Sequence, residues 1–162
     1  MFFTLATNQA QVRSSTAQLI ATISSIEIPR KEWPDVLSKL TANASIDKLD
    51  LRISVLQTLG FICEELYASD FAEEERTSII LALINNISKD ESTEKNQVAT
   101  KALLNAISFA SQNFEKDNER DFIMGKIFEA CTIDDEETRQ YAMQTLVEVG
   151  RIYYDYVEHY FQ

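Results

Sequence analysis

Glycine and proline are scarce in this chain of 162 residues, which contains three glycines and two prolines. The hairpin turns of β-sandwiches and β-barrels depend on these two residue types, so the scarcity argues against an all-β fold. A disordered chain is also excluded, because 45% of the residues are hydrophobic and 25% are charged, as in ordinary globular domains. We therefore expect an all-α protein.

Basic residues are in the minority, since 15 lysines and arginines stand against 26 aspartates and glutamates and give a net charge of −11. Nucleic acid and anionic membrane surfaces would repel such a chain. We expect no nucleic-acid and no membrane partner, but a partner that is basic or neutral. No apolar run approaches the roughly 18 residues of a membrane-spanning helix, which indicates a soluble, intracellular protein.

Groups that could catalyse a reaction are also few. The single histidine, His159, lies in the aromatic segment 153–161, where a packing role is the simpler interpretation. Glycine-rich phosphate loops and the common metal and nucleophile motifs are missing. Cys63 and Cys131 lie in separate apolar helical patterns and form no CxxC pair, so we interpret both as buried thiols in a reducing compartment. The sequence predicts neither an enzyme nor a protein with a metal or another cofactor.

A repeat of about 42 residues organises the chain. Its anchor positions, at intervals of 39, 45 and 42 residues, are Arg13, Arg52, Gln97 and Arg139. Two apolar residues follow each anchor, seven and ten positions later: Ile20 and Ile23, Leu59 and Ile62, Leu104 and Ile107, and Leu146 and Val149. Such spacing places both members of each pair on the same face of a helix.

A second helical pattern lies between successive anchors, at 33–43, 71–87 and 118–130. Each unit is therefore a predicted helical hairpin, and because one hairpin cannot bury its apolar face alone, neighbouring hairpins must stack. The period and helix content indicate an α-solenoid of the HEAT and armadillo class. We expect one HEAT-repeat solenoid fragment over 1–162, with a partial repeat at 9–26, repeats at about 32–67, 71–113 and 118–150, and the start of a further repeat at 151–162.

Several residues mark the predicted ends of these helices. Asp70 with Glu73, and Asp134 with Glu137, have the spacing of capping boxes. Pro34 suits the first position of a helix. The polar run 88–95 predicts the longest connection, a solvated loop inside one repeat.

Five stretches of the sequence resemble the amino-terminal part of the importin-β family of nuclear import receptors, which are built of HEAT repeats. These stretches are Glu27-Ile28-Pro29 with Trp33-Pro34, Leu59-Gly60-Phe61-Ile62-Cys63, Ala102-Leu103-Leu104-Asn105, the string from Asn113 to Met124, and Tyr153-Tyr154-Asp155-Tyr156. The resemblance runs from about Gln9 to the last residue. It implies that the chain corresponds to the third through sixth repeats and the opening of the seventh.

The resemblance also implies a function. Importin-β proteins hold phenylalanine-glycine (FG) repeats of nucleoporins in grooves between neighbouring outer helices, and they release cargo when Ran-GTP binds. In the full-length family, importin-α and cargo are further partners, and the protein moves between cytoplasm and nucleus through the nuclear pore. Carried over by position, one FG groove has two walls: Ile80, Leu81 and Ile84 on the helix at 71–87, and Glu119, Phe122 and Ile123 on the helix at 118–130.

Helical spacing leaves two interpretations of this groove open. The apolar residues between Ile79 and Ile87 cover an arc of roughly 200°, wider than the ~100° stripe of a helix that is buried on one side only. The excess either packs on the adjoining repeat or lines an exposed groove. The function has an alternative as well, a purely structural HEAT scaffold such as a phosphatase scaffold, a coat adaptor or a chromosome-organising subunit.

Overall fold

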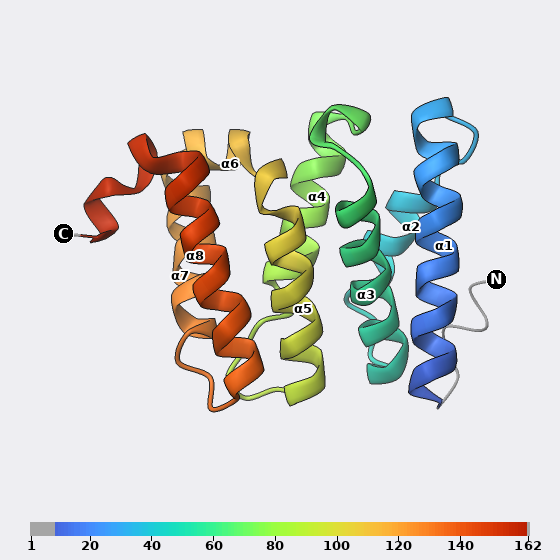
Figure 1. Ribbon diagram of the computed structural model, residues 1–162, viewed down its shortest axis with the longest axis horizontal. Coiled ribbons are helices and arrows are strands. Elements are labelled where there is room, and N and C mark those ends of the chain that lie inside the picture. Colours follow the sequence, from blue (N-terminus) through green and yellow to red (C-terminus); the bar gives the residue numbers. More distant parts are fainter. Residues whose placement is uncertain (1–8, 162) are drawn as a thin grey trace.

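The structure is a computed structural model that describes residues 9–161, and all its regular structure in this range is helical. The elements are α1 (Ala10–Arg30), α2 (Val36–Asn43), α3 (Leu49–Glu65), η2 (Ala68–Asp70), α4 (Glu73–Ile84), α5 (Thr93–Ala106), η3 (Ile107–Phe109), α6 (Ser111–Glu115), α7 (Asp117–Ala130), α8 (Glu136–Val157) and η4 (Glu158–Phe161). They follow one another from one end of the molecule to the other (Figure 1). The prediction of an all-α solenoid is confirmed.

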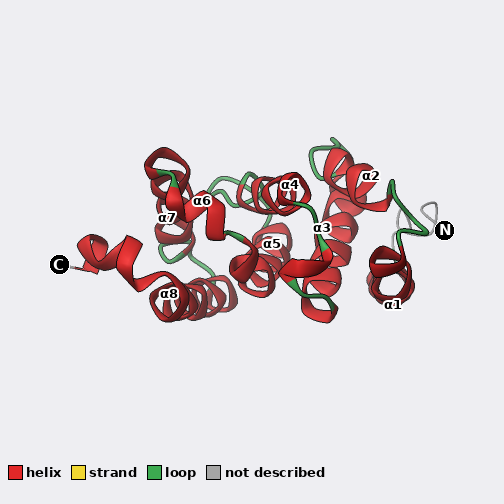
Figure 2. Ribbon diagram, turned by 90° about the horizontal axis from the view of Figure 1, so that it is seen from above, coloured by secondary structure: helices red, strands yellow, loops and turns green. Residues whose placement is uncertain are grey.

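The helices form two layers, which are visible from above (Figure 2). Layer A contains α2, α4 and α7, and layer B contains α1, α3, α5 and α8. Consecutive helices of layer B pack side by side, as α1 does against α3, α3 against α5, and α5 against α8. In layer A, α4 contacts both α2 and α7, although less extensively. The chain therefore alternates between the layers, and every hairpin shares its apolar face with the next.

A continuous core fills the space between the layers. Leu56, Leu59 and Ile62 of α3 are fully buried, because their three-residue spacing places them on one face of the helix. Among the apolar residues that follow the anchors, Ile20, Leu59, Ile62, Ile107 and Val149 are buried, whereas Ile23, Leu104 and Leu146 are partly buried. The repeat pattern of the sequence thus corresponds to the core.

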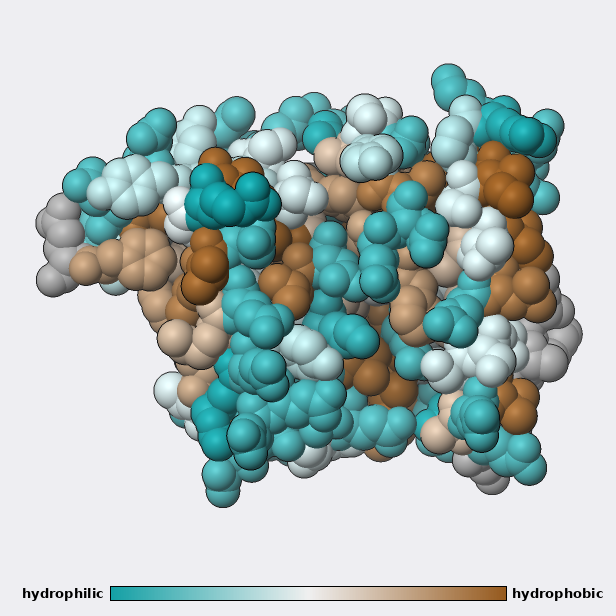
Figure 3. All heavy atoms as spheres, viewed as in Figure 1, coloured by the Kyte–Doolittle hydropathy of each residue, from teal (hydrophilic) through white to brown (hydrophobic). Residues whose placement is uncertain are grey.

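The side of α1 that faces away from α3 is apolar. Val12, Leu19 and Ile26 are exposed there at intervals of seven residues. Hydrophobic residues gather along this helix in the space-filling view (Figure 3). The residue six positions after the anchor is Leu19 in α1 and Leu103 in α5, yet Leu19 is 53% exposed and Leu103 is buried. The two exposed fractions differ because α3 covers this side of α5, whereas no described helix covers the corresponding side of α1.

The anchor residues of the repeat make polar contacts that join consecutive units. Arg13 of α1 is buried and lies 3.3 Å from Asp50 of α3 and 3.2 Å from Glu94 of α5. Gln97 of α5 donates hydrogen bonds to Asp135 at the start of α8. These contacts satisfy buried polar groups across the stack and fix the register between neighbouring hairpins.

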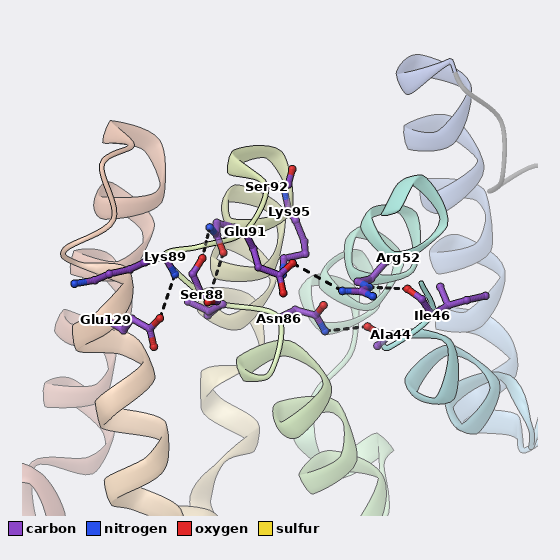
Figure 4. A network of polar contacts seen from close by, with 12 residues as sticks. Ala44, Ile46, Arg52, Asn86, Ser88, Lys89, Glu91, Ser92, Lys95 and Glu129 are labelled. Carbon is purple, nitrogen blue, oxygen red and sulfur yellow. Dashed lines mark hydrogen bonds and ion pairs between the residues drawn. The ribbon is translucent and has the colours of Figure 1, made fainter. Parts of the chain in front are cut away.

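A second polar network surrounds the connection between α4 and α5 (Figure 4). Arg52 donates to the carbonyl oxygen of Ile46 at 2.7 Å, and its guanidinium lies 3.9 Å from Glu91. Glu91 also lies 2.5 Å from the ammonium nitrogen of Lys95, which is fully buried. The prediction of a solvated loop over 88–95 is wrong for Lys95, because α5 already begins at Thr93 and its first turn packs into the core.

Three predicted helix ends are also displaced. Asp70 does not cap α4 but accepts a hydrogen bond from the backbone N–H of Tyr67, while the backbone N–H of Ala72 donates to Glu75. At α8 the cap is Asp135, one residue after the predicted Asp134. Runs of consecutive acids offer several capping registers, so the spacing alone did not decide between them.

The third displaced end is that of α2. Pro34 lies in the turn before this helix, which begins at Val36. At the other end of the chain, α8 continues to Val157 but bends at Tyr153, whose φ of −121° and ψ of 24° are not helical. The hydroxyl of Tyr153 donates to the carbonyl oxygen of Ile107 at 2.9 Å, and its ring stacks on Phe114. The bend therefore coincides with a contact that anchors the end of α8 to the preceding unit.

The layer B helices α3 and α5 approach each other closely at Gly60. A Cβ atom added to Gly60 of α3 would lie 2.9 Å from the Cβ of Ala102 in α5, which is closer than real contacts allow. Gly60→Ala should therefore lower the free energy of unfolding by about 1 kcal/mol, because α3 and α5 would have to move apart. Urea unfolding followed by circular dichroism measures this change.

A matched control for Gly60→Ala is available in α7. Nothing lies within 4 Å of a Cβ added to Gly125, so Gly125→Ala should raise the free energy of unfolding by about 0.5–1 kcal/mol through helix propensity alone. If both variants raised the free energy of unfolding, α3 and α5 would be shown to tolerate a wider spacing.

The buried ammonium of Lys95 depends on Glu91 for its counter-charge. Glu91→Gln should lower the free energy of unfolding by on the order of 1–3 kcal/mol, because it leaves a charge buried without an ionic partner. The double variant Glu91→Gln/Lys95→Met should recover most of this loss, since it removes the charge as well. A double variant no more stable than the single variant would show that the pair has no such role.

The same pair should make folding sensitive to acid. The hydrogen bond from Lys95 lowers the pKa of Glu91 below its ordinary value of 4.5. A lowered pKa in the folded state contributes stability that is present above the unfolded-state pKa and is lost as the pH falls through the folded-state value. The free energy of unfolding of the wild type, measured relative to the double variant, should therefore be constant near neutral pH. It should decrease as the pH falls below about 4.5. Denaturant titrations at several pH values test this, and a constant difference down to pH about 3 would contradict it.

Candidate partner-binding grooves of layer A

The six residues that the sequence analysis assigned to a groove come from α4 and α7, which contact each other in layer A. Ile80 and Ile84 of α4 are fully buried, and Ile123 of α7 is 1% exposed. Leu81 and Phe122 are exposed, to 40% and 44%. The structure therefore brings the two helices together but leaves only two of the five apolar side chains accessible to a partner.

The wide apolar arc of α4 is mostly core. Ile79, Ile80, Leu83 and Ile84 of α4 are fully buried, and Leu81 is exposed. The predicted helix at 71–87 is shorter in the structure, so the fully buried Ile87 follows the turn after α4. Both sides of the arc are covered because α4 packs against α5 as well as against its neighbours in layer A. Of the two interpretations that the helical spacing left open, packing on adjoining elements describes these five residues.

Glu119 is held at the start of α7 by two hydrogen bonds. Its Oε2 accepts a bond of 2.8 Å from Asn113, and its Oε1 accepts one of 3.1 Å from Lys116. The side chain remains 37% exposed. Each carboxylate oxygen can accept more than one hydrogen bond, so Glu119 retains acceptor capacity toward a partner.

The turn between α6 and α7 sets the position of Glu119 and Phe122. Phe114 of α6 is buried and stacks on Tyr153 at a centroid distance of 4.2 Å. Arg120 of α7 donates to the carbonyl oxygen of Phe114 at 3.0 Å. These contacts fix α7 at its first turn, which is the turn before Phe122. Sequence reasoning found the string from Asn113 to Met124 through its resemblance alone and did not identify these supporting roles.

Leu81 faces a second groove, which the sequence analysis did not find. This groove lies between α2 and α4 and has a volume of about 540 Å³. One stripe of α4 lines it, formed by Glu74, Ser78, Leu81 and Asn85. The i, i+4, i+7 and i+11 spacing of this stripe was visible in the sequence, but the opposite wall depends on where α2 lies.

The residues considered for metal binding or catalysis are separate in space. Among residues 9–161, no three His, Cys, Asp or Glu side chains are grouped so that they could hold a metal ion. Within the same range, no helix is both long and apolar enough to cross a membrane. Cys63 is buried as predicted, and burial raises the pKa of its thiol, whereas Cys131 is only partly buried. Both cysteines are free thiols.

Comparison with known proteins gives relatives of one kind. No protein-family model matches the chain. Importin subunit beta-1 of Arabidopsis thaliana is 34% identical over 160 residues, which are 98% of this chain and 18% of that protein. Importin subunit beta-1 of Schizosaccharomyces pombe is 29% identical over 161 residues. The chain spans less than one fifth of the length of these relatives.

Solved structures show the same likeness. A crystal structure of importin beta superimposes with a TM-score of 0.88 at 28% identity and covers 98% of this chain and 19% of that one. A structure of Kap95p, whose binding induces the switch loops of RanGDP to adopt the GTP-bound conformation, gives a TM-score of 0.87 at 25% identity over 98% of this chain and 19% of that one. The resemblance found in the sequence is confirmed, and the chain is a HEAT-repeat homologue of one segment of importin subunit beta-1.

Proposed function

We propose that this chain is a segment of a nuclear transport receptor and that it binds FG repeats of nucleoporins between α4 and α7. The observation that carries the proposal is the likeness to importin beta over 98% of the chain. It is supported by Phe122, an aromatic side chain that is 44% exposed on a helix in contact with α4. Surface-exposed aromatic rings of this kind are typical anchors of protein interfaces.

The chemistry of the proposed site is the burial of one phenylalanine ring. A ring that packs against Phe122 would lose contact with water, which is worth on the order of 1.5–3 kcal/mol. Glu119 would accept a hydrogen bond from the peptide backbone at the same time. The buried Ile80, Ile84 and Ile123 would form a rigid support beneath the contact.

A single site of this kind would bind a peptide with low affinity. Ordering a flexible peptide offsets much of the gain from burying one ring, so a single groove should bind and release rapidly. Useful affinity would come from several grooves on one receptor that engage a multivalent nucleoporin. Fast, weak and repeated contacts suit passage through the nuclear pore, so we place the protein in the cytoplasm, the nucleus and the pore.

Further partners follow from the longer proteins that the chain resembles. Kap95p binds RanGDP in a matched structure, and we propose Ran, importin-α and cargo as partners of a full-length receptor that contains this segment. The chain covers about one fifth of such a protein, so these partners would contact residues outside it as well. Binding of partners, and not catalysis, is the activity that we propose.

A purely structural scaffold is the second candidate. The observation in its favour is the burial of Ile80, Ile84 and Ile123, which leaves a shallow surface between α4 and α7. In that case α4 and α7 would only connect neighbouring repeats, and peptides would not bind there.

An NMR titration separates the two candidates. The probe is a short peptide with one Phe-Gly unit in a glycine-serine background, added to the isotope-labelled chain. We expect fast-exchange shifts around Phe122, and Phe122→Ala should weaken binding by roughly tenfold or more because the aromatic contact is lost.

Phe128→Ala is the matched control for Phe122→Ala. Phe128 is also an exposed aromatic residue of α7, at 37%, and its ring lies against that of Tyr160 in η4. Binding should change less than about twofold in this variant. Equal weakening in both variants, or no shifts with folded protein at millimolar peptide, would leave the scaffold as the function.

A further inference from the structure

The groove between α2 and α4 continues beyond the first hollow. A second hollow of about 550 Å³ extends it toward Trp33 and Phe71, and the two hollows share Leu37 and Glu75 on their walls. Together they form one elongated groove on layer A, which we call the α2–α4 groove. Each half has the volume of a typical ligand site, so the two halves together have room for a short peptide segment.

The walls of the α2–α4 groove offer hydrogen-bond acceptors. The hydroxyl groups of Ser38, Thr41 and Ser78 donate to backbone carbonyl oxygens three or four residues earlier in the chain, at 3.1, 2.9 and 2.7 Å. Only the oxygen lone pairs of these three hydroxyl groups remain for a partner. The carboxylates of Glu74 and Glu75 are acceptors as well. A partner that brings hydrogen-bond donors would match these acceptors.

The charge of the α2–α4 groove is negative. Asp70, Glu74 and Glu75 line it, and Lys31 is the one cation among its described lining residues. Glu74 is exposed and lines the first hollow, on the same stripe of α4 as the 40% exposed side chain of Leu81. The groove thus combines an acidic rim with an apolar floor.

Asn86 fixes the width of the α2–α4 groove. Its Nδ2 donates to the carbonyl oxygen of Ala82 in α4 at 2.7 Å and to that of Ala44, at the end of α2, at 3.0 Å. The second bond joins two neighbouring repeats (Figure 4). A groove that is formed before binding loses little free energy to ordering, so its few contacts can give measurable affinity.

From these observations we infer that the α2–α4 groove binds an extended peptide segment in which lysine or arginine stands next to an apolar side chain. The ammonium or guanidinium group, which carries only donors, meets Glu74, and the peptide N–H groups meet the hydroxyl oxygens. The apolar side chain covers Leu81 and Leu37. The net charge of −11 attracts such a segment from solution. This site is separate from the α4–α7 surface and does not depend on the function proposed for it.

Fluorescence anisotropy tests the inference directly. The probe is a labelled peptide of alternating lysine and leucine between glycine-serine ends, and the control peptide has glutamate in place of lysine. The lysine peptide should bind with micromolar to millimolar affinity and the glutamate peptide should not bind. Glu74→Lys should weaken binding of the lysine peptide by about fivefold or more, because it reverses a charge on the wall of the groove.

Glu73→Lys is the matched control, since Glu73 also lies in the first turn of α4 and is exposed but does not line the groove. It changes the net charge and the helix terminus in the same way, so binding should change less than about twofold. Ser78→Arg fills the groove at an exposed position and should abolish binding while circular dichroism shows an unchanged fold. Equal effects of Glu73→Lys and Glu74→Lys would reduce the binding to general charge attraction and overturn the proposed site.

Two further results would overturn the inference. Full binding by Ser78→Arg would place the peptide elsewhere on the chain. Sedimentation that shows a dimer of the free chain, lost in Ser78→Arg, would make a second copy of this chain the occupant. An FG peptide should bind Glu74→Lys and the wild type alike, so a loss of lysine-peptide binding alone separates this site from the α4–α7 surface.

Discussion

The packing of α3 against α5 is the contact on which the rest of the structure depends. Gly60 and Ala102 let these two helices approach so closely that an added methyl group would not fit. Both helices belong to layer B, where consecutive helices contact each other over much of their length. Because each hairpin covers the apolar face of the next, the spacing at this contact determines how α2, α4 and α7 stand relative to one another in layer A.

The grooves of layer A are a consequence of that arrangement. Layer B helices are in extensive contact, but α4 meets α2 and α7 over a smaller area. The side chains on the flanks of α4 therefore have different environments: Ile80 and Ile84 fill the core, while Leu81 remains exposed beside α2. Polar links such as the bond from Asn86 to Ala44 hold the open side at a fixed width. One face of α4 thus contributes to the core, and another face lines an open groove.

Much of the fold could be predicted from the sequence, because helical period and repeat spacing are local properties. The anchors Arg13, Arg52 and Gln97 marked the repeat, and in the structure each of them makes a polar contact with a following unit. The predicted helix ends were less accurate, as Asp134 shows, because neighbouring acidic residues can cap a helix equally well in isolation. The choice between them depends on tertiary packing of the first turn.

The candidate sites were harder to predict, since burial depends on what lies opposite each face. The family resemblance assigned Ile80, Leu81 and Ile84 to one wall of a groove, yet the structure buries the two isoleucines completely. Lys95 looked like a loop residue because its neighbours are polar, but it packs beneath Glu91. The α2–α4 groove could not be found at all, because its walls lie about one repeat apart in the chain. Burial and groove formation depend on the distances between elements, which local sequence patterns do not specify.

The two sides of α4 would select partners by different physical properties. On the α7 side, Phe122 is an exposed aromatic surface, where ring burial would dominate and charge would matter little. On the α2 side, Glu74 and the hydroxyl oxygens favour a donor-rich, positively charged segment, and an acidic segment would be repelled. Because one rigid helix forms a wall of both, the two sites have a fixed separation of about one helix diameter, on the order of 10 Å. A flexible partner that carries an aromatic and a basic segment at a matching separation could occupy both, and the second contact would then form at a high effective concentration.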